Sequence, residues 1–172
     1  MPDDDAARRI RLLVLDVDGV LSDGLVSIDA RGVETKAFHT RDGAGITIWR
    51  RLGHEVAIIT GRSSMTVQHR ADELGIRHVF QGVRNKMDVL GNLLNDLGLA
   101  ASEAAVMGDD LPDLPMLRLA GYPIAVADAA CEVRALAAFE TERPGGQGAV
   151  REAIEHLLKA QDRWDEALAL FD

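Results

Sequence analysis

Two aspartates at the end of an apolar run are the residues of this sequence best placed to do chemistry. Asp16 and Asp18 follow the aliphatic residues 12–15, and Gly19 comes directly after them. Residues two apart in an extended chain point to the same side, so the two carboxylates would repel and raise each other's pKa. A cation would remove this repulsion, and Mg²⁺ suits the pair because it takes oxygen ligands. The pair could also be only a strand end and a turn, since Asp and Gly are common turn formers.

Further groups suited to the same chemistry follow later apolar runs or begin a helix. They are Thr60, Lys86, Asp109, Asp110 and Asp113. Carboxylates, a hydroxyl, a lysine and a metal ion are the materials of phosphoryl transfer, which depends on positioning and charge stabilisation. One carboxylate can attack phosphorus to form an aspartyl-phosphate, and a second can protonate the leaving oxygen and then activate water.

The elements that must hold these groups alternate between strand and helix. The apolar pattern predicts strands at residues 12–15, 56–59, 78–82, 104–107, 122–126 and 138–141, and helices at 42–53, 63–75, 86–97 and from 150 onward. Such alternation is typical of an α/β fold with a mainly parallel sheet flanked by helices. Because ligands bind where the carboxyl ends of parallel strands meet, we expect the scattered polar groups to form one pocket.

Residues 22–38 have a different pattern, in which apolar and polar residues alternate around a Gly-containing turn at 30–32. This pattern predicts a β-hairpin, and its place directly after Asp18 predicts a flap over the site. The C-terminal tail, residues 159–172, carries Trp164 and Phe171 after most core positions are filled. We expect the tail to contact another subunit.

Composition narrows the class of protein. The 172 residues are 47% hydrophobic and 27% charged, which predicts a single domain over residues 1–172. The net charge of −9 argues against nucleic-acid and anionic-membrane partners. Three features predict a cytoplasmic protein. The start of the sequence is acidic and lacks an apolar segment, no apolar run reaches transmembrane length, and there is a single cysteine, Cys131. We expect five residues to be buried in the core: Cys131, Met65, Met87, Met107 and Met116.

The chemical groups stand in the order and strand context of the haloacid dehalogenase superfamily. The segment from Asp16 to Leu21 resembles its first motif, Thr60 its second, Lys86 its third and residues 108–113 its fourth. The resemblance spans roughly residues 10–158. It implies a Rossmann-like fold, and the chain leaves no room for a large cap domain.

Residues 38–43, 108–115 and 144–152 are similar to the capless sugar-acid phosphatases of this superfamily. The resemblance implies hydrolysis of 3-deoxy-D-manno-octulosonate 8-phosphate, as in lipopolysaccharide biosynthesis, or of the 9-phosphate of a nine-carbon sialic-type acid. It also implies a homotetramer in which a neighbouring subunit completes each active site. His39 stands where asparagine is common, and Gln147 where arginine is common, so the identity of the sugar stays open.

The resemblance implies roles for the acidic residues. Asp16 is the nucleophile and a Mg²⁺ ligand, and Asp18 is the general acid and base, with its backbone carbonyl on the metal. Asp109 is the third protein ligand. Asp110 lies behind the ligands or near the metal, and Asp113 orients Lys86 or a metal-bound water.

The remaining candidates bind phosphate or substrate. Thr60, Gly61 and Lys86 hold the transferring phosphoryl oxygens, Arg62 contacts the substrate and Arg41 recognises the carboxylate of the sugar acid. Arg62 could instead be a surface cation, and Arg41 the neighbour of a helix cap. Two alternative functions would involve no phosphatase activity. The chain could be a response-regulator-like module that holds an aspartyl-phosphate, or a non-catalytic homologue with a structural role.

Overall fold

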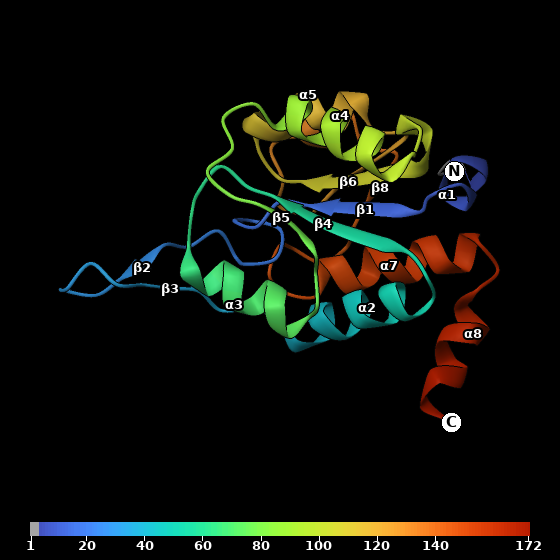
Figure 1. Ribbon diagram of the computed structural model, residues 1–172, viewed down its shortest axis with the longest axis horizontal. Coiled ribbons are helices and arrows are strands. Elements are labelled where there is room, and N and C mark those ends of the chain that lie inside the picture. The colour runs from blue at the N-terminus through green and yellow to red at the C-terminus, as the bar shows by residue number, and fades with distance from the viewer. Residues whose placement is uncertain (1–3) are drawn as a thin grey trace.

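A parallel sheet of six strands forms the centre of this computed structural model, which describes residues 4–172 (Figure 1). The strands are β1 (Leu12–Leu15), β4 (Glu55–Ile59), β5 (His78–Phe80), β6 (Ala104–Gly108), β7 (Tyr122–Ala125) and β8 (Phe139–Glu140). Their spatial order is β5-β4-β1-β6-β7-β8, and neighbouring strands pair in parallel. All of β1 is buried, as expected for a continuous aliphatic run covered on both faces.

Helices cover both faces of the sheet in Figure 1. One face carries α2 (Thr40–Arg51), α3 (Met65–Glu73) and α7 (Ala149–Ala160), and the other carries α4 (Lys86–Leu97) and α5 (Leu114–Leu119). The short helices α6 (Cys131–Arg134) and α1 (Asp4–Arg8) contact α5 and α7 respectively. The predicted α/β fold with a mainly parallel sheet is confirmed, and residues 4–172 contain no large cap domain.

The start of α4 shows how local sequence sets a boundary next to the site. Asn85 caps the helix with its side-chain oxygen, which accepts a hydrogen bond from the backbone of the first turn. Gly98 ends the helix in the left-handed conformation, with φ +64°. The bounds Lys86–Leu97 match the prediction, and they place Lys86 as the first helical residue, at the carboxyl edge of the sheet.

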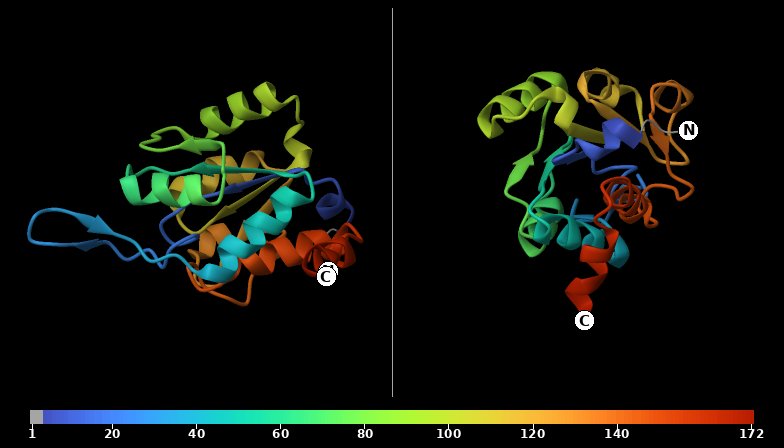
Figure 2. Two further views of the ribbon diagram at one scale, coloured as in Figure 1. Left: turned by 60° about the horizontal axis from the view of Figure 1, so that its bottom comes forward. Right: turned by 90° about the vertical axis from the view of Figure 1, so that its right-hand side faces the viewer.

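The hairpin predicted for residues 22–38 is present as β2 (Ser27–Ile28) and β3 (Glu34–Thr35). Its turn is closed by Asp29, whose carboxylate accepts hydrogen bonds from the backbone of Arg31 and Val33. The paired strands project away from the sheet (Figure 2, left), and only the base of the hairpin lies against the body. Four large apolar side chains are among those exposed along the hairpin: Leu25, Val26, Ile28 and Val33.

The C-terminal segment forms a separate short helix. Asp162 has a positive φ of 56° between α7 and α8 (Trp164–Leu168), and a 3₁₀ turn over Ala169–Phe171 follows. Lys159 lies over the Trp164 ring, 5.4 Å from its centroid, which ties α8 to the end of α7. Phe171 is 71% exposed, so the prediction that the tail contacts another subunit stays open.

Three residues predicted to be buried are exposed. Cys131 is exposed, Met65 is 70% exposed and Met87 is 43% exposed. Each stands at the first or second position of a helix. The prediction was wrong because residue type alone does not reveal which side of a helix start faces solvent.

In residues 4–172, no helix is both long and apolar enough to cross a membrane. The expectation about the start of the chain rests partly on residues 1–3, which lie outside the described residues.

Candidate active site

A cavity of about 350 Å³ opens at the carboxyl edge of the sheet. It forms there because β1, β4 and β6 run side by side in register and end together, which brings the residues after each strand to one place. The structure thus brings together all but one of the predicted site residues. Those that line the cavity are Asp16, Asp18, Thr60, Gly61, Arg62, Lys86, Asp109, Asp110 and Asp113.

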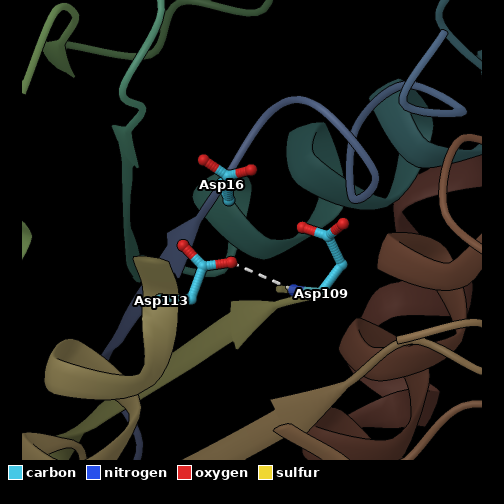
Figure 3. Close-up of side chains that lie close together, drawn as sticks. All are labelled: Asp16, Asp109 and Asp113. Atoms are coloured by element: carbon cyan, nitrogen blue, oxygen red, sulfur yellow. Dashed lines mark hydrogen bonds between the residues drawn. The ribbon is translucent and has the colours of Figure 1, made fainter. Parts of the chain in front are cut away.

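Three carboxylates that line this cavity lie close together (Figure 3). Asp16, Asp109 and Asp113, here called the carboxylate cluster, each offer one oxygen, and these oxygens lie within 4.8 Å of one another. Burial and the neighbouring Asp113 raise the pKa of Asp16 to about 6. Burial and the neighbouring Asp16 raise the pKa of Asp109 to about 8. A group of carboxylates that resists ionisation in this way is suited to hold a divalent cation.

Lys86 already neutralises part of the cluster. Its Nζ lies 2.7 Å from Asp16 Oδ1 and 2.6 Å from Asp113 Oδ1, and its side chain is 6% exposed. Burial lowers the pKa of Lys86, but the two carboxylates outweigh it and hold the pKa above its ordinary value. They also offset the unfavourable position of a cation at the start of a helix.

Both oxygens of Asp113 are occupied by protein donors. Oδ1 accepts from Lys86, and Oδ2 accepts from the backbone N–H of Asp109 at 3.0 Å. Asp113 therefore joins Lys86 to the loop after β6. Asp16 and Asp109 have oxygens left for a metal ion, so they are the better ligands of the cluster.

Gly19 allows the loop after β1 to approach this site. It has φ +91°, and a Cβ atom there would lie 2.1 Å from Asp109 Oδ2. Any side chain would therefore clash with the Asp109 carboxylate unless that carboxylate moved. The loop is supported from behind by Gly146, whose N–H donates to Val20 O at 2.9 Å.

The Asp18 carboxylate turns to the hairpin side of the cavity. Its Oδ1 accepts a hydrogen bond from Lys36 Nζ, and its Oδ2 lies 3.8 Å from Arg62 Nε. Glu34 contacts both Lys36 and Arg62. The hydrogen bond from Arg62, followed by the one from Lys36, lowers the pKa of Glu34 to about 2. Sequence reasoning missed Glu34 and Lys36. The sequence signal that could have found them is that Glu34 and Lys36 are two residues apart, because this spacing puts both side chains on the same side of an extended backbone.

Thr60 is held by the sheet at the opposite wall. It is 2% exposed, its N–H donates to Phe80 O at 2.9 Å, and its carbonyl accepts from Val83 N at 3.0 Å. These backbone bonds continue the β4–β5 pairing one step past the strand, so the hydroxyl and the adjacent Gly61 reach the cavity.

Arg41 is the predicted site residue that the structure places elsewhere. It lines a second cavity of about 510 Å³ together with Arg143 and Arg151. The cap of α2 is His39, whose Nδ1 accepts from the Arg41 N–H at 3.1 Å. Asp42 is buried and accepts from the backbone of Arg151 at 2.8 Å, which joins the starts of α2 and α7.

Comparison with known proteins places this chain among phosphatases. A sequence model of the haloacid dehalogenase-like hydrolases matches residues 76–154. The 3-deoxy-D-manno-octulosonate 8-phosphate phosphatase KdsC of Escherichia coli K12 is 48% identical over 161 residues, which cover 94% of this chain and 86% of that protein.

Solved structures of such phosphatases have the same fold. The enzyme from Moraxella catarrhalis, crystallised with magnesium, phosphate and KDO, superposes with a TM-score of 0.95 at 45% identity, covering 98% of this chain and 97% of the other. The cobalt-bound enzyme from Haemophilus influenzae gives a TM-score of 0.92 at 35% identity, covering 97% and 99%.

Proposed function

Because this chain belongs to the haloacid dehalogenase-like hydrolases, in the family of the 3-deoxy-D-manno-octulosonate 8-phosphate phosphatases, we propose that it hydrolyses that sugar-acid phosphate to the free sugar acid and phosphate. The observation that carries the proposal is the Asp16–Lys86 pair inside a cavity that also contains Asp18 and Asp109. Such a reaction would serve lipopolysaccharide biosynthesis. The net charge of −9 is compatible with an anionic substrate because a bound metal ion, together with Lys86 and Arg62, would offset the carboxylates that line this pocket.

Asp16 attacks the phosphorus atom and forms an aspartyl-phosphate, while the bond from phosphorus to the sugar oxygen breaks. Asp18 gives a proton to that departing oxygen. Asp18 then takes a proton from water as the water oxygen attacks phosphorus, which releases phosphate and restores Asp16. Lys86, Thr60 and Gly61 bind the phosphoryl oxygens during both steps.

The site fits Mg²⁺, which supplies charge that offsets the carboxylates and the phosphoryl oxygens when it is bound. Asp16, the backbone carbonyl of Asp18 and Asp109 would hold the ion. Asp113 supports Lys86, since both of its oxygens already accept hydrogen bonds, and Asp110 lies behind the ligands. The raised pKa values of Asp16 and Asp109 support this assignment, because a bound cation would relieve the repulsion that raises them.

Substrate recognition involves Arg62 and Arg41. Arg62 lines the cavity and is paired with Glu34, so it stands where the sugar would emerge. Arg41 lies outside this cavity, so it can reach a sugar acid only in the site of a neighbouring subunit. We therefore propose a cytoplasmic homotetramer of single-domain chains, built through the exposed apolar side chains of the hairpin.

The substrate panel that tests this proposal contains the 8-phosphate of the eight-carbon sugar acid and the 9-phosphates of nine-carbon sialic-type acids. We expect kcat/KM for the 8-phosphate to exceed the others by at least tenfold. Higher kcat/KM for a 9-phosphate would reassign the substrate, and equal, weak rates on all would contradict a dedicated sugar-acid phosphatase.

A further inference from the structure

Lys36 is a buried lysine at the base of the hairpin with no part in the reaction as derived above. Its side chain is fully buried, its ammonium contacts Asp18 Oδ1, and it lies 3.2 Å from Glu34 Oε1. A buried ammonium must be compensated by carboxylates because it has lost its hydration. These contacts therefore fix the lysine and, equally, the two carboxylates that it touches.

Asp16 and Asp18 are two residues apart, yet different lysines hold them. Lys86 holds Asp16 inside the carboxylate cluster, whereas Lys36 holds Asp18 on the hairpin side of the cavity. The Asp18 carboxylate accordingly stands outside the cluster, although both side chains line the same cavity. A free carboxylate at this spacing could turn inward and become a metal ligand.

We propose that Lys36 is a positioning residue that keeps the Asp18 carboxylate out of the cluster and turned toward the leaving group. The inference rests on the proposed phosphatase function. It explains how Asp16 and Asp18 can have different roles in the reaction, because Lys86 positions the first and Lys36 positions the second. Lys36 acts through Asp18 and touches neither phosphorus nor metal.

The same contacts connect Asp18 to the position of the hairpin. Glu34 and Asp18 each contact both Lys36 and Arg62. The two carboxylates and the two cations therefore alternate around a closed ring of ion pairs. Glu34 belongs to β3, and Lys36 follows it by two residues. A displacement of the hairpin would therefore move Lys36 and, with it, the proton-transfer group.

Lys36→Met tests the proposal with p-nitrophenyl phosphate as the probe. Nitrophenolate leaves without a proton, so phosphoryl transfer to Asp16 should stay fast, while hydrolysis of the aspartyl-phosphate, which needs Asp18 as a base, should slow. We expect kcat to fall about 10- to 100-fold with KM within threefold, and a pre-steady-state burst of about one nitrophenolate per site. A raised KM with unchanged kcat would show that Lys36 binds substrate directly, and would overturn the proposal.

A double-mutant comparison tests whether Lys36 acts through Asp18. Adding Lys36→Met to Asp18→Asn should slow phosphate release by less than twofold, since the residue that Lys36 positions is already gone. A further tenfold loss would contradict the proposal. Lys36→Arg, which keeps the cation, should recover part of kcat, and the exposed Lys159→Met should behave as wild type.

Two provisions keep the test decisive. If Lys36→Met does not fold, Lys36→Gln, which keeps a donor and removes the charge, is used in the same assays with the same expectations. Failure of the proposed function would appear as wild-type protein inactive on the 8-phosphate. Failure of the positioning role would appear as Lys36 variants that turn over p-nitrophenyl phosphate at the wild-type rate without a burst.

Discussion

The ammonium of Lys86 lies 2.7 Å from Oδ1 of Asp16, although the two residues are 70 positions apart in the chain. The pair exists because β1 and α4 both reach the carboxyl edge of one parallel sheet. It places a fixed cation beside the proposed nucleophile, where it can also receive phosphoryl oxygens.

Lys86→Met should lower kcat/KM for the 8-phosphate by about 100- to 1000-fold, because a stabilising charge is lost where the phosphoryl group transfers. It also leaves Asp16 and Asp113 buried without their cation. The free energy of unfolding of the metal-free protein should therefore fall by about 3 kcal/mol, measured by urea denaturation. Lys159→Met is the matched control: it should leave kcat/KM unchanged and lower the free energy of unfolding by less than about 1 kcal/mol, because its contacts lie at the surface. Wild-type kcat/KM in the Lys86 variant would refute the role assigned to this lysine.

Gly19→Ala should abolish Mg²⁺ binding and activity, because its Cβ would lie 2.1 Å from Asp109 Oδ2. Gly32→Ala provides the control: Gly32 has a similar φ of +81° but nothing within 4 Å of its Cβ position. Both variants carry about 1 kcal/mol of backbone strain, and only the first adds a clash. Calorimetric titration with Mg²⁺ separates them, and equal affinities in the two variants would show that the close approach at Gly19 is unimportant.

The metal-free protein should become less stable as pH rises from 5 to 8. The pKa of Asp109, about 8, lies above its ordinary value of 3.8, so the folded state holds a proton that the unfolded state has released. That stabilisation is complete below pH 4 and is lost as pH rises through 8. The Tm in EDTA should therefore fall across this window, and Asp109→Asn should flatten the slope. A Tm that rises with pH in EDTA would contradict the assigned environment of Asp109.

Mixing two inactive variants should restore activity if Arg41 works in a neighbour's site. Asp16→Asn lacks the nucleophile, and Arg41→Ala lacks the proposed carboxylate contact. In mixed oligomers, an Arg41→Ala subunit can supply Asp16 while its Asp16→Asn neighbour supplies Arg41. Co-expressed variants should exceed the mean of the two separate preparations several-fold in kcat/KM. Activity equal to that mean would place Arg41 outside catalysis.

Much of the fold and site could be predicted from local patterns. The buried strand β1, the helix α4 with its Asn85 cap and the grouping of Thr60, Lys86 and Asp109 at one edge all follow from apolar periodicity and parallel topology. These predictions succeeded because each depends on the order of elements and on their ends, which sequence records directly.

What could not be predicted depends on contacts between distant segments. The pairing of Lys36 with Asp18 requires knowing where the base of the hairpin lies, and the separate cavity around Arg41 requires knowing how the starts of α2 and α7 meet. The exposure of Cys131 depends on the orientation of a four-residue helix that has no periodic signal.

The central claim is that this chain is a Mg²⁺-dependent phosphatase whose nucleophile is Asp16. The measurement that tests it most directly is release of phosphate from 3-deoxy-D-manno-octulosonate 8-phosphate by wild type with Mg²⁺, wild type with excess EDTA, and Asp16→Asn with Mg²⁺. We predict turnover in the first sample and at least a 1000-fold lower rate in the other two. Turnover by Asp16→Asn at a rate near wild type would contradict the account.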